Sequence, residues 1–152
     1  MLTHPSLKQH HGTLVGLALG YLADRGERPV LHPTNRLDRD TSGIVLFARH
    51  AFAHADLMEQ MRKGLVRKRY LGLVYGEMPK DRGVIDCRIG RAQDSFLTRR
   101  VDAGGLPART EYQVREVHAF QGQRLSLVHL WPITGLTLQL RLHCLFHAAP
   151  LV

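Results

Sequence analysis

The chain has 152 residues, a length that favours one domain with its own hydrophobic core. Hydrophobic residues make up 44% of it, which excludes an intrinsically disordered chain. Lysine and arginine number 21 against 13 aspartates and glutamates, giving a formal net charge of +8. This excess favours a polyanionic partner such as nucleic acid, because each phosphate contact releases counterions. A solubilising surface charge without a partner is the alternative.

The cysteine content and the apolar stretches bear on the compartment. Cys87 and Cys144 lie far apart, so no disulfide framework or zinc pattern follows, and we expect two buried thiols in a reducing cytosol. The first twelve residues, MLTHPSLKQHHG, lack the apolar segment of a signal peptide. The longest apolar stretches, such as Leu14 to Leu22, are too short to span a membrane. We therefore expect a cytoplasmic protein with no membrane partner.

Helical spacing dominates the first part of the chain. Thr13 to Ala23 (TLVGLALGYLA) predicts a short helix capped by Thr13, and a loop follows over residues 25–33. Ile44 to Ala48 is a continuous apolar run and predicts a buried strand. His50 to Arg62 predicts a second helix, which Gly64 terminates.

Strands dominate the remainder. Arg69 to Tyr75 predicts a strand with Tyr70, Gly72 and Val74 on one face. A short strand is expected near Val84 to Arg88, and an exposed loop over residues 92–107.

The last part of the chain predicts a hairpin and a helix. Residues 108–117 and 124–131 alternate as two paired strands, with the turn at Gln121-Gly122-Gln123. Thr137 is expected to cap a helix from Leu138 to about His147. The order of elements indicates an α+β fold with a largely antiparallel sheet.

Asp38 lies just before the apolar run that is predicted to be a strand. Residues 35–48 read NRLDRDTSGIVLFA, and Asp38 lies between Arg36 and Arg39. Neighbouring cations favour the charged form of a carboxylate. An ionised aspartate in a pocket can act as a nucleophile, a general base or a metal ligand. The alternative is a turn residue whose side chain bonds the following amides.

The segment Arg36-Leu37-Asp38-x-x-Thr41-Ser42-Gly43 resembles the signature of the pseudouridine synthases, in particular the RluA-type family. Further blocks resemble that family in the same order. They are Lys68-Arg69-Tyr70 with Leu73 to Gly76, Ile85-Asp86 with Ile89-Gly90-Arg91, Ala108 to Tyr112 (ARTEY), and Thr134 to His143 (TGLTLQLRLH). The similarity covers nearly the whole chain.

The resemblance implies a fold and a reaction. The fold is α+β, a mixed and mostly antiparallel sheet with flanking helices, and we expect residues 1–152 to be a single catalytic domain shortened at both ends. The reaction converts uridine in structured RNA, ribosomal or transfer RNA, to pseudouridine. It requires no redox cofactor, metal or ATP in this family, and we expect the enzyme to be a monomer.

The resemblance also implies roles for three residues. Asp38 matches the catalytic aspartate, Tyr70 the active-site tyrosine, whose ring can stack on uracil, and Arg141 the arginine that pairs with the aspartate. The alternatives are a core aromatic for Tyr70 and an ordinary surface arginine for Arg141.

Basic residues near these positions are candidates for phosphate binding, with a solvated charged edge as the alternative. Phosphate contacts and stacking must offset the cost of flipping the target base. The candidates are Arg36, Arg39, Arg62, Lys63, Arg67, Lys68 and Arg69. His143 and His147 have a zinc-like i, i+4 spacing but no third ligand, so we expect no metal site.

The chain departs from the family pattern at three positions. Asn35 replaces the usual histidine before Arg-Leu-Asp, Leu136 replaces an arginine, and Leu138 replaces a second histidine. Two alternatives therefore stay open. One is a catalytically impaired or truncated relative that binds RNA without isomerising it. The other is a small basic RNA-binding protein outside the family, in which the Asp38 segment is only a turn.

Overall fold

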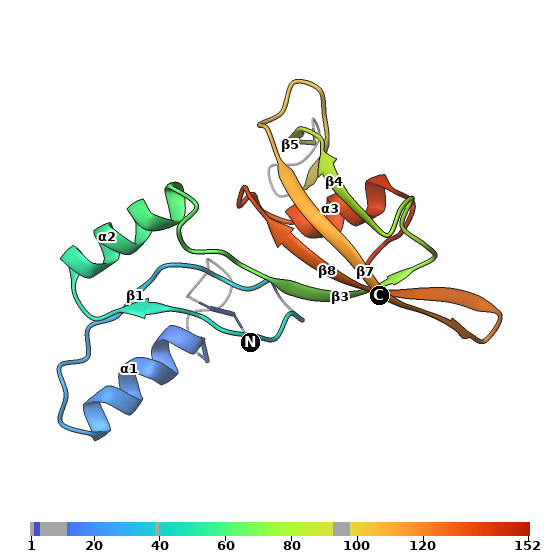
Figure 1. Ribbon diagram of the computed structural model, residues 1–152. Helices are drawn as coiled ribbons and strands as arrows, with labels where there is room; N and C mark the ends of the chain where they lie inside the picture. The colour runs from blue at the N-terminus through green and yellow to red at the C-terminus, as the bar shows by residue number, and fades with distance from the viewer. Residues whose placement is uncertain (1, 4–11, 39, 93–97) are drawn as a thin grey trace. The chain divides into compact units, whose positions relative to one another are not determined.

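The computed structural model describes residues 2–3, 12–38, 40–92 and 98–152. The chain forms two compact units, Met1–Val66 and Arg67–Val152. Among the described residues, the first unit holds two helices and a two-stranded ladder, and the second holds six strands and a third helix (Figure 1). All strand pairs among the described residues are antiparallel. This confirms the predicted α+β class.

The two helices of the first unit begin at residues whose side chains cap them. In α1 (Leu14–Asp24), Thr13 Oγ1 accepts a hydrogen bond of 3.2 Å from the amide three residues later. In α2 (Ala51–Arg62), His50 Nδ1 accepts one of 3.1 Å in the same way. Such bonds satisfy amides that lack a partner within the helix. Both predicted helices are confirmed to within one residue at each end.

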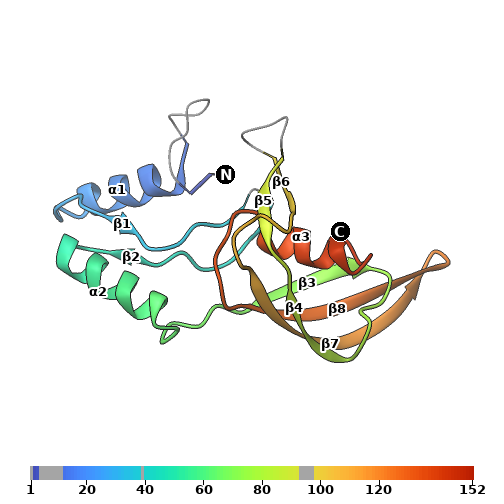
Figure 2. The same ribbon diagram turned by 90° about the horizontal axis from the view of Figure 1, so that it is seen from above.

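The ladder of the first unit is shorter than predicted. β1 (His32–Pro33) pairs only with β2 (Phe47–Ala48), and the ladder lies between α1 and α2 in Figures 1 and 2. The prediction of a buried strand from Ile44 onward is wrong, because Ile44 is 87% exposed. The side chain of Asn35 occupies main-chain groups that a partner strand would otherwise use. The apolar run alone does not reveal that competition.

The main sheet of the second unit has the order β3-β8-β7-β4. The bounds are Tyr70–Tyr75 for β3, Arg82–Asp86 for β4, Arg109–Phe120 for β7 and Gln123–Pro132 for β8. β7 and β8 form the predicted hairpin, whose turn at Gln121-Gly122 has positive φ angles of 49° and 76°. The short strand expected near Val84 begins two residues earlier. The sequence did not predict that β3 pairs with β8.

A two-stranded sheet of the second unit has one of its strands in the segment predicted to be a loop. β5 (Ile89–Arg91) pairs with β6 (Arg99–Val101), so the prediction for residues 92–107 is wrong over β6. Residues 93–97 of that segment lie outside the described residues. Polar strands such as β6 carry no apolar alternation, so only the pairing with β5 identifies it.

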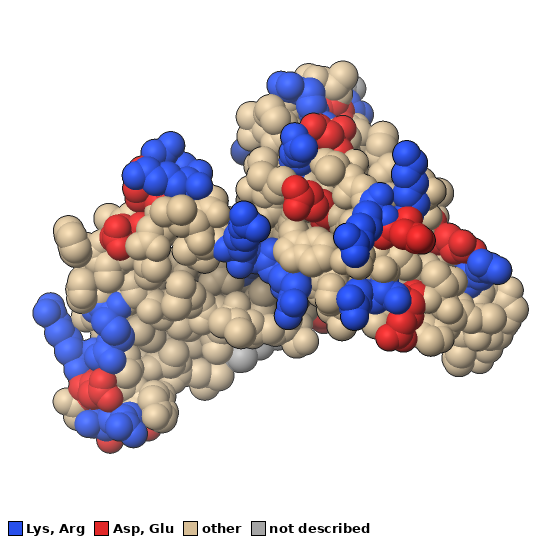
Figure 3. Space-filling model, viewed as in Figure 1, with Lys and Arg blue, Asp and Glu red and all other residues tan. Residues whose placement is uncertain are grey.

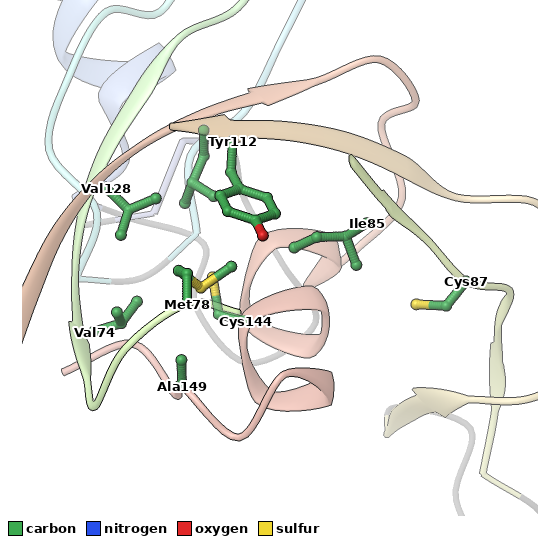
Figure 4. Packing of buried hydrophobic residues seen from close by; sticks show 9 residues of the cluster. Val74, Met78, Ile85, Cys87, Tyr112, Val128, Cys144 and Ala149 are labelled. Atoms are coloured by element: carbon green, nitrogen blue, oxygen red, sulfur yellow. The ribbon is translucent and has the colours of Figure 1, made fainter. Parts of the chain in front are cut away.

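The core of the second unit lies between the main sheet and α3 (Gln139–Phe146). Figure 4 shows Val128 and Tyr112 pointing from the strands toward this helix, with Met78 next to Cys144 of the helix. Val74 is buried, whereas Leu71, Leu73 and Tyr75 on the opposite face of β3 are exposed. The predicted division of β3 into two faces is confirmed. Both cysteines are buried free thiols, as predicted.

The start of α3 differs from the prediction. Thr137 does not cap it; the N-cap position is Leu138, at φ 58°, and no side chain caps the helix there. Instead Gln139, the first helical residue, turns its side chain back, and its Oε1 accepts a hydrogen bond of 3.0 Å from the Leu136 amide. This bond fastens the preceding loop to the helix and does not cap an amide of the helix itself.

A buried polar network joins α3 to β7. The Gln139 amide nitrogen donates to the Arg109 carbonyl oxygen (3.1 Å) and to Thr110 Oγ1 (3.0 Å), and Thr110 Oγ1 lies 2.9 Å from Nδ1 of His143. Gln139, Thr110 and His143 are at most 3% exposed. Burial lowers the pKa of His143, with the Cys87 backbone opposing that shift, so the ring is neutral at pH 7. Buried networks of this kind fix one helix position.

We expect Gln139→Leu to lower the free energy of unfolding by about 2 kcal/mol or more, because it leaves buried donors and acceptors without partners. Arg141→Ala, on the exposed side of the same helix, should change it by less than about 0.5 kcal/mol. Urea denaturation followed by circular dichroism measures both. Equal, small effects of the two variants would show that the network does not hold α3 in place.

Candidate functional site

The signature loop, which we define as residues 36–45, is closed at its base by two residues that precede it. The Thr34 amide and hydroxyl both donate to the Leu46 carbonyl oxygen, at 2.9 and 3.0 Å. The Asn35 side chain donates to the Ile44 carbonyl oxygen (3.2 Å) and accepts from the Leu46 amide (2.8 Å). The carboxamide thus bonds to the returning chain as a strand would. The asparagine that replaces the family's usual histidine therefore keeps this loop closed.

Asp38 lies within the signature loop in a turn made by the main chain. The Asp38 carbonyl oxygen accepts a hydrogen bond of 3.1 Å from the Thr41 amide, and Asp40 has a φ of 69°. The Asp38 side chain is half-buried and bonds to none of the residues that the structure describes. Among the described residues, no amide bonds its carboxylate in the way that the turn-former alternative requires. Within the described part of the chain, the turn therefore forms without a bond from either carboxylate oxygen.

Tyr70 and Arg141 lie in the second unit. Tyr70 opens β3 opposite Leu130, is half-buried and packs against the core cluster, so the alternative of a core aromatic accounts for part of its ring. Arg141 is exposed, between the buried Gln139 and His143 on α3. Its guanidinium has no hydrogen bond or ion pair with the described residues. Asp38 belongs to the first unit, and its pairing with Arg141 stays a prediction.

The predicted basic run divides into groups with different surroundings. Arg62 and Lys63, at the end of α2, both pair with Glu59, at 2.6 and 3.3 Å, and Arg62 lowers the pKa of that carboxyl. Lys68 is half-buried; its Nζ would lie 3.2 Å from a Cβ on Gly135, and burial lowers its pKa. Its ammonium group therefore lies against the loop before α3 and is partly withdrawn from solvent.

The other basic candidates are exposed: they are Arg36, Arg67 and Arg69. Arg39 lies outside the described residues. Among the described residues, no group of three histidines, cysteines or acidic residues is arranged to hold a metal ion. No helix in the described part of the chain is long and apolar enough to cross a membrane.

Sequence reasoning gave no role to the residues that position these groups. Asn35 was treated only as a departure from the family pattern, although it closes the signature loop. Gln139 and His143 hold the helix that carries Arg141 through Thr110. Their i, i+4 spacing indicates a shared helix face, but only the structure identifies Thr110 as their common partner.

We expect Asn35→Ala to speed hydrogen exchange at the Leu46 amide about tenfold, because the main bond protecting that amide is lost. Ser42→Ala, at an exposed position in the same loop, is the matched control and should leave the exchange rate unchanged. Exchange measured by NMR or mass spectrometry gives both rates. Unaltered protection in the Asn35 variant would contradict the assigned closure.

Comparison with known proteins places these features in one family. The model of the RNA pseudouridylate synthase family matches residues 9–146. The chain is 36% identical over 147 residues to YjbO of Bacillus subtilis, an uncharacterized RNA pseudouridine synthase, covering 97% of this chain and 50% of the relative. It is 35% identical over 151 residues to the ribosomal large subunit pseudouridine synthase D of Nitrosomonas europaea, covering 99% and 42%.

A solved structure gives the same result. The human RNA pseudouridylate synthase domain containing 1 superposes with a TM-score of 0.72 at 30% identity, over 86% of this chain and 56% of the human one. The chain spans about half the length of the curated relatives it matches. The ordered blocks, the antiparallel fold and these matches together lead to one conclusion: the chain belongs to the RNA pseudouridylate synthase family and is of the RluA type.

Proposed function

We propose that this chain isomerises uridine to pseudouridine in RNA and that Asp38 is the catalytic carboxylate. The observation that carries the proposal is the carboxylate of Asp38, which has no bond to any described residue, in a loop closed by Asn35 at the position of the family signature. A main-chain turn presents the side chain without consuming its oxygens. A catalytic side chain needs a fixed backbone that positions it and a functional group that is free to contact the substrate.

The chemistry suits a carboxylate. Detaching uracil from its ribose requires attack at the sugar carbon, attack on the ring or removal of a sugar proton. An ionised carboxylate can perform each of these steps. The detached base then turns and rejoins the ribose through carbon. Tyr70 is assigned to stack on the uracil, and its hydroxyl can relay a proton.

Arg141 is assigned to pair with Asp38, so the two units together act as one catalytic domain. Support comes from its exposure on α3 and from the buried bonds of Gln139 and His143 that hold this helix. A guanidinium in that role orients the carboxylate by charge-assisted hydrogen bonds.

The RNA substrate is assigned to ribosomal or transfer RNA, with cytoplasmic action on either. Relatives named as ribosomal large subunit pseudouridine synthases C and D favour the ribosomal choice. Phosphate contacts are assigned to Arg36, Arg39, Arg67 and Arg69, and more weakly to Arg62, Lys63 and Lys68. Arg62 and Lys63 pair with Glu59, and Lys68 is partly buried, so these three are less available to phosphates. The comparisons give no support to a relative that binds RNA without isomerising it.

Asp38→Asn is expected to lower kcat for pseudouridine formation by between about a hundredfold and ten-thousandfold, because it removes the charge and the basicity of the reagent. Bulk unmodified ribosomal RNA is the substrate, and pseudouridine is detected by mass spectrometry of the digested product. Asp40→Asn, two residues away, is the matched control. Equal product from wild type and Asp38→Asn would remove Asp38 from the mechanism.

Arg141→Ala is expected to lower kcat about a hundredfold while leaving the unfolding free energy nearly unchanged, since the side chain is exposed. Combining it with Asp38→Asn tests the pairing. If the two residues act together, the double variant loses little more than Asp38→Asn alone. Additive losses would contradict the pairing.

A further inference from the structure

The outer face of the main sheet is the side that α3 does not cover. The helix packs on the inner face through Cys144, and Figure 2 shows no other helix of this unit beside the four strands. On the outer face, Leu71 is 61% and Val84 45% exposed. This face is opposite the one on which Tyr70 packs. Within the second unit it is therefore a different surface from the one on which Tyr70 packs.

Cross-strand pairing arranges outer-face residues of β4, β7 and β8 in two rows. The rows are Val84–Glu111–Trp131 and Arg82–Gln113–His129. Residues directly opposite each other on one face of a sheet lie close enough for their side chains to touch. Residues nearly 50 positions apart in the sequence thus form one small surface, which we call the outer platform.

The outer platform is hollowed. Five of its six residues, all but His129, line a depression of about 400 Å³ together with Gly83 and Tyr112. The depression is shallow and open to solvent, so a ligand there would lie on the surface of the sheet. The rings of His129 and Trp131 meet edge to face, with centroids 5.4 Å apart, which limits the orientations of the indole. The platform therefore offers a held aromatic ring beside a depression that can take a planar ligand.

Polar groups in the depression have no partners in the part of the chain that the structure describes. The side chains of Arg82, Glu111 and Gln113 make no hydrogen bond or ion pair there, although Arg82 and Glu111 carry opposite charges. The indole N–H of Trp131 is likewise unbonded within the described residues. Hydrogen-bond donors and hydrogen-bond acceptors are thus both available to one ligand.

Cations surround this surface. Burial lowers the pKa of His129, and the charges of Arg115 and Arg69 lower it further, so both arginines lie near that ring. Figure 3 shows lysine and arginine side chains on both sides of an uncharged area over these strands. Aromatic rings between cations are the arrangement with which proteins bind single-stranded nucleic acid. An anionic, planar ligand fits better here than an apolar peptide segment.

We propose that the outer platform binds an unpaired guanine of the RNA substrate, stacked on Trp131, with its Watson–Crick edge on Glu111 and a neighbouring phosphate on Arg82. Guanine fits Glu111 because its N1–H and 2-amino group are adjacent donors that match the two carboxylate oxygens. Uracil offers a single N–H. This inference rests on the proposed function, since it adds a second contact to the same RNA.

The binding test uses intrinsic fluorescence, because Trp131 is the sole tryptophan of the chain. The full chain is titrated with the oligoribonucleotides UUGUU and UUUUU and with polyglutamate, a polyanion without bases. We expect saturable quenching by UUGUU, an affinity about tenfold lower for UUUUU, and no quenching by polyglutamate. Equal affinity for both oligonucleotides, or quenching by polyglutamate, overturns the proposal.

Variants assign the contacts, with fluorescently labelled UUGUU and anisotropy as the readout. Trp131→Ala should weaken binding about tenfold, and Glu111→Gln should remove the preference for guanine. Arg82→Ala should lower the salt dependence by about one phosphate contact. Phe120→Ala, an exposed aromatic at the end of β7, is the control and should change nothing. Glu111 is exposed, so its variant tests the proposal even if Trp131→Ala does not fold.

Failure of this inference and failure of the proposed function give different results. Asp38→Asn should bind UUGUU with unchanged affinity while losing isomerisation. Guanine-selective binding by a wild type that forms no pseudouridine overturns only the proposed function. Isomerisation by a wild type that does not distinguish UUGUU from UUUUU overturns only the outer platform.

Discussion

The pairing of β7 with β8 is the constraint on which the second unit depends. The hairpin supplies the two central strands of the main sheet, so β3 and β4 take their positions from it. Its inner face carries Tyr112 and Val128 into the core, and Thr110 receives the hydrogen bonds that hold α3. Its outer face aligns Glu111 with Trp131. A shift of one residue in this register would exchange the two faces.

In the first unit, hydrogen bonds hold the signature loop without using the Asp38 side chain. The carboxylate that we propose as the catalytic group must be held still, yet its oxygens must stay free of the bonds that hold it. Here the side chain of Asn35 and both polar groups of Thr34 bind the returning chain, and a main-chain bond to Thr41 forms the turn. The Asp38 side chain takes no part in these bonds. The groups that position the loop are therefore different from the carboxylate that is proposed to react.

The basic residues that give the net charge of +8 differ in their surroundings. Arg62 and Lys63 share Glu59, and Arg124 pairs with Glu77, so part of the excess is balanced locally. Exposed ion pairs of this kind contribute little to stability. Arg82 and Arg141, which have no ion pair with any described residue, are among the residues to which the proposals assign functions. Charge counted from the sequence therefore overstates the number of cations free to meet phosphates.

Local patterns in the sequence were sufficient for some elements. Helical spacing predicted α1 and α2, Thr13 was predicted to cap α1, and alternation around Gln121-Gly122 predicted the β7–β8 hairpin. The faces of β3 also followed from alternation. The resemblance of ordered blocks identified the family, because each block is read within a few residues. All of these signals act between residues that are close along the chain.

Only the tertiary structure decided the remainder, because there the partners lie far apart in the sequence. Asn35 prevents a longer strand at Ile44, β6 exists through its pairing with β5, and Gln139 rather than Thr137 bonds the start of α3. The outer platform likewise exists only through cross-strand register. In each of these features, segments that are distant in the sequence form hydrogen bonds or pack together. A local sequence pattern does not show which distant partner a residue will have.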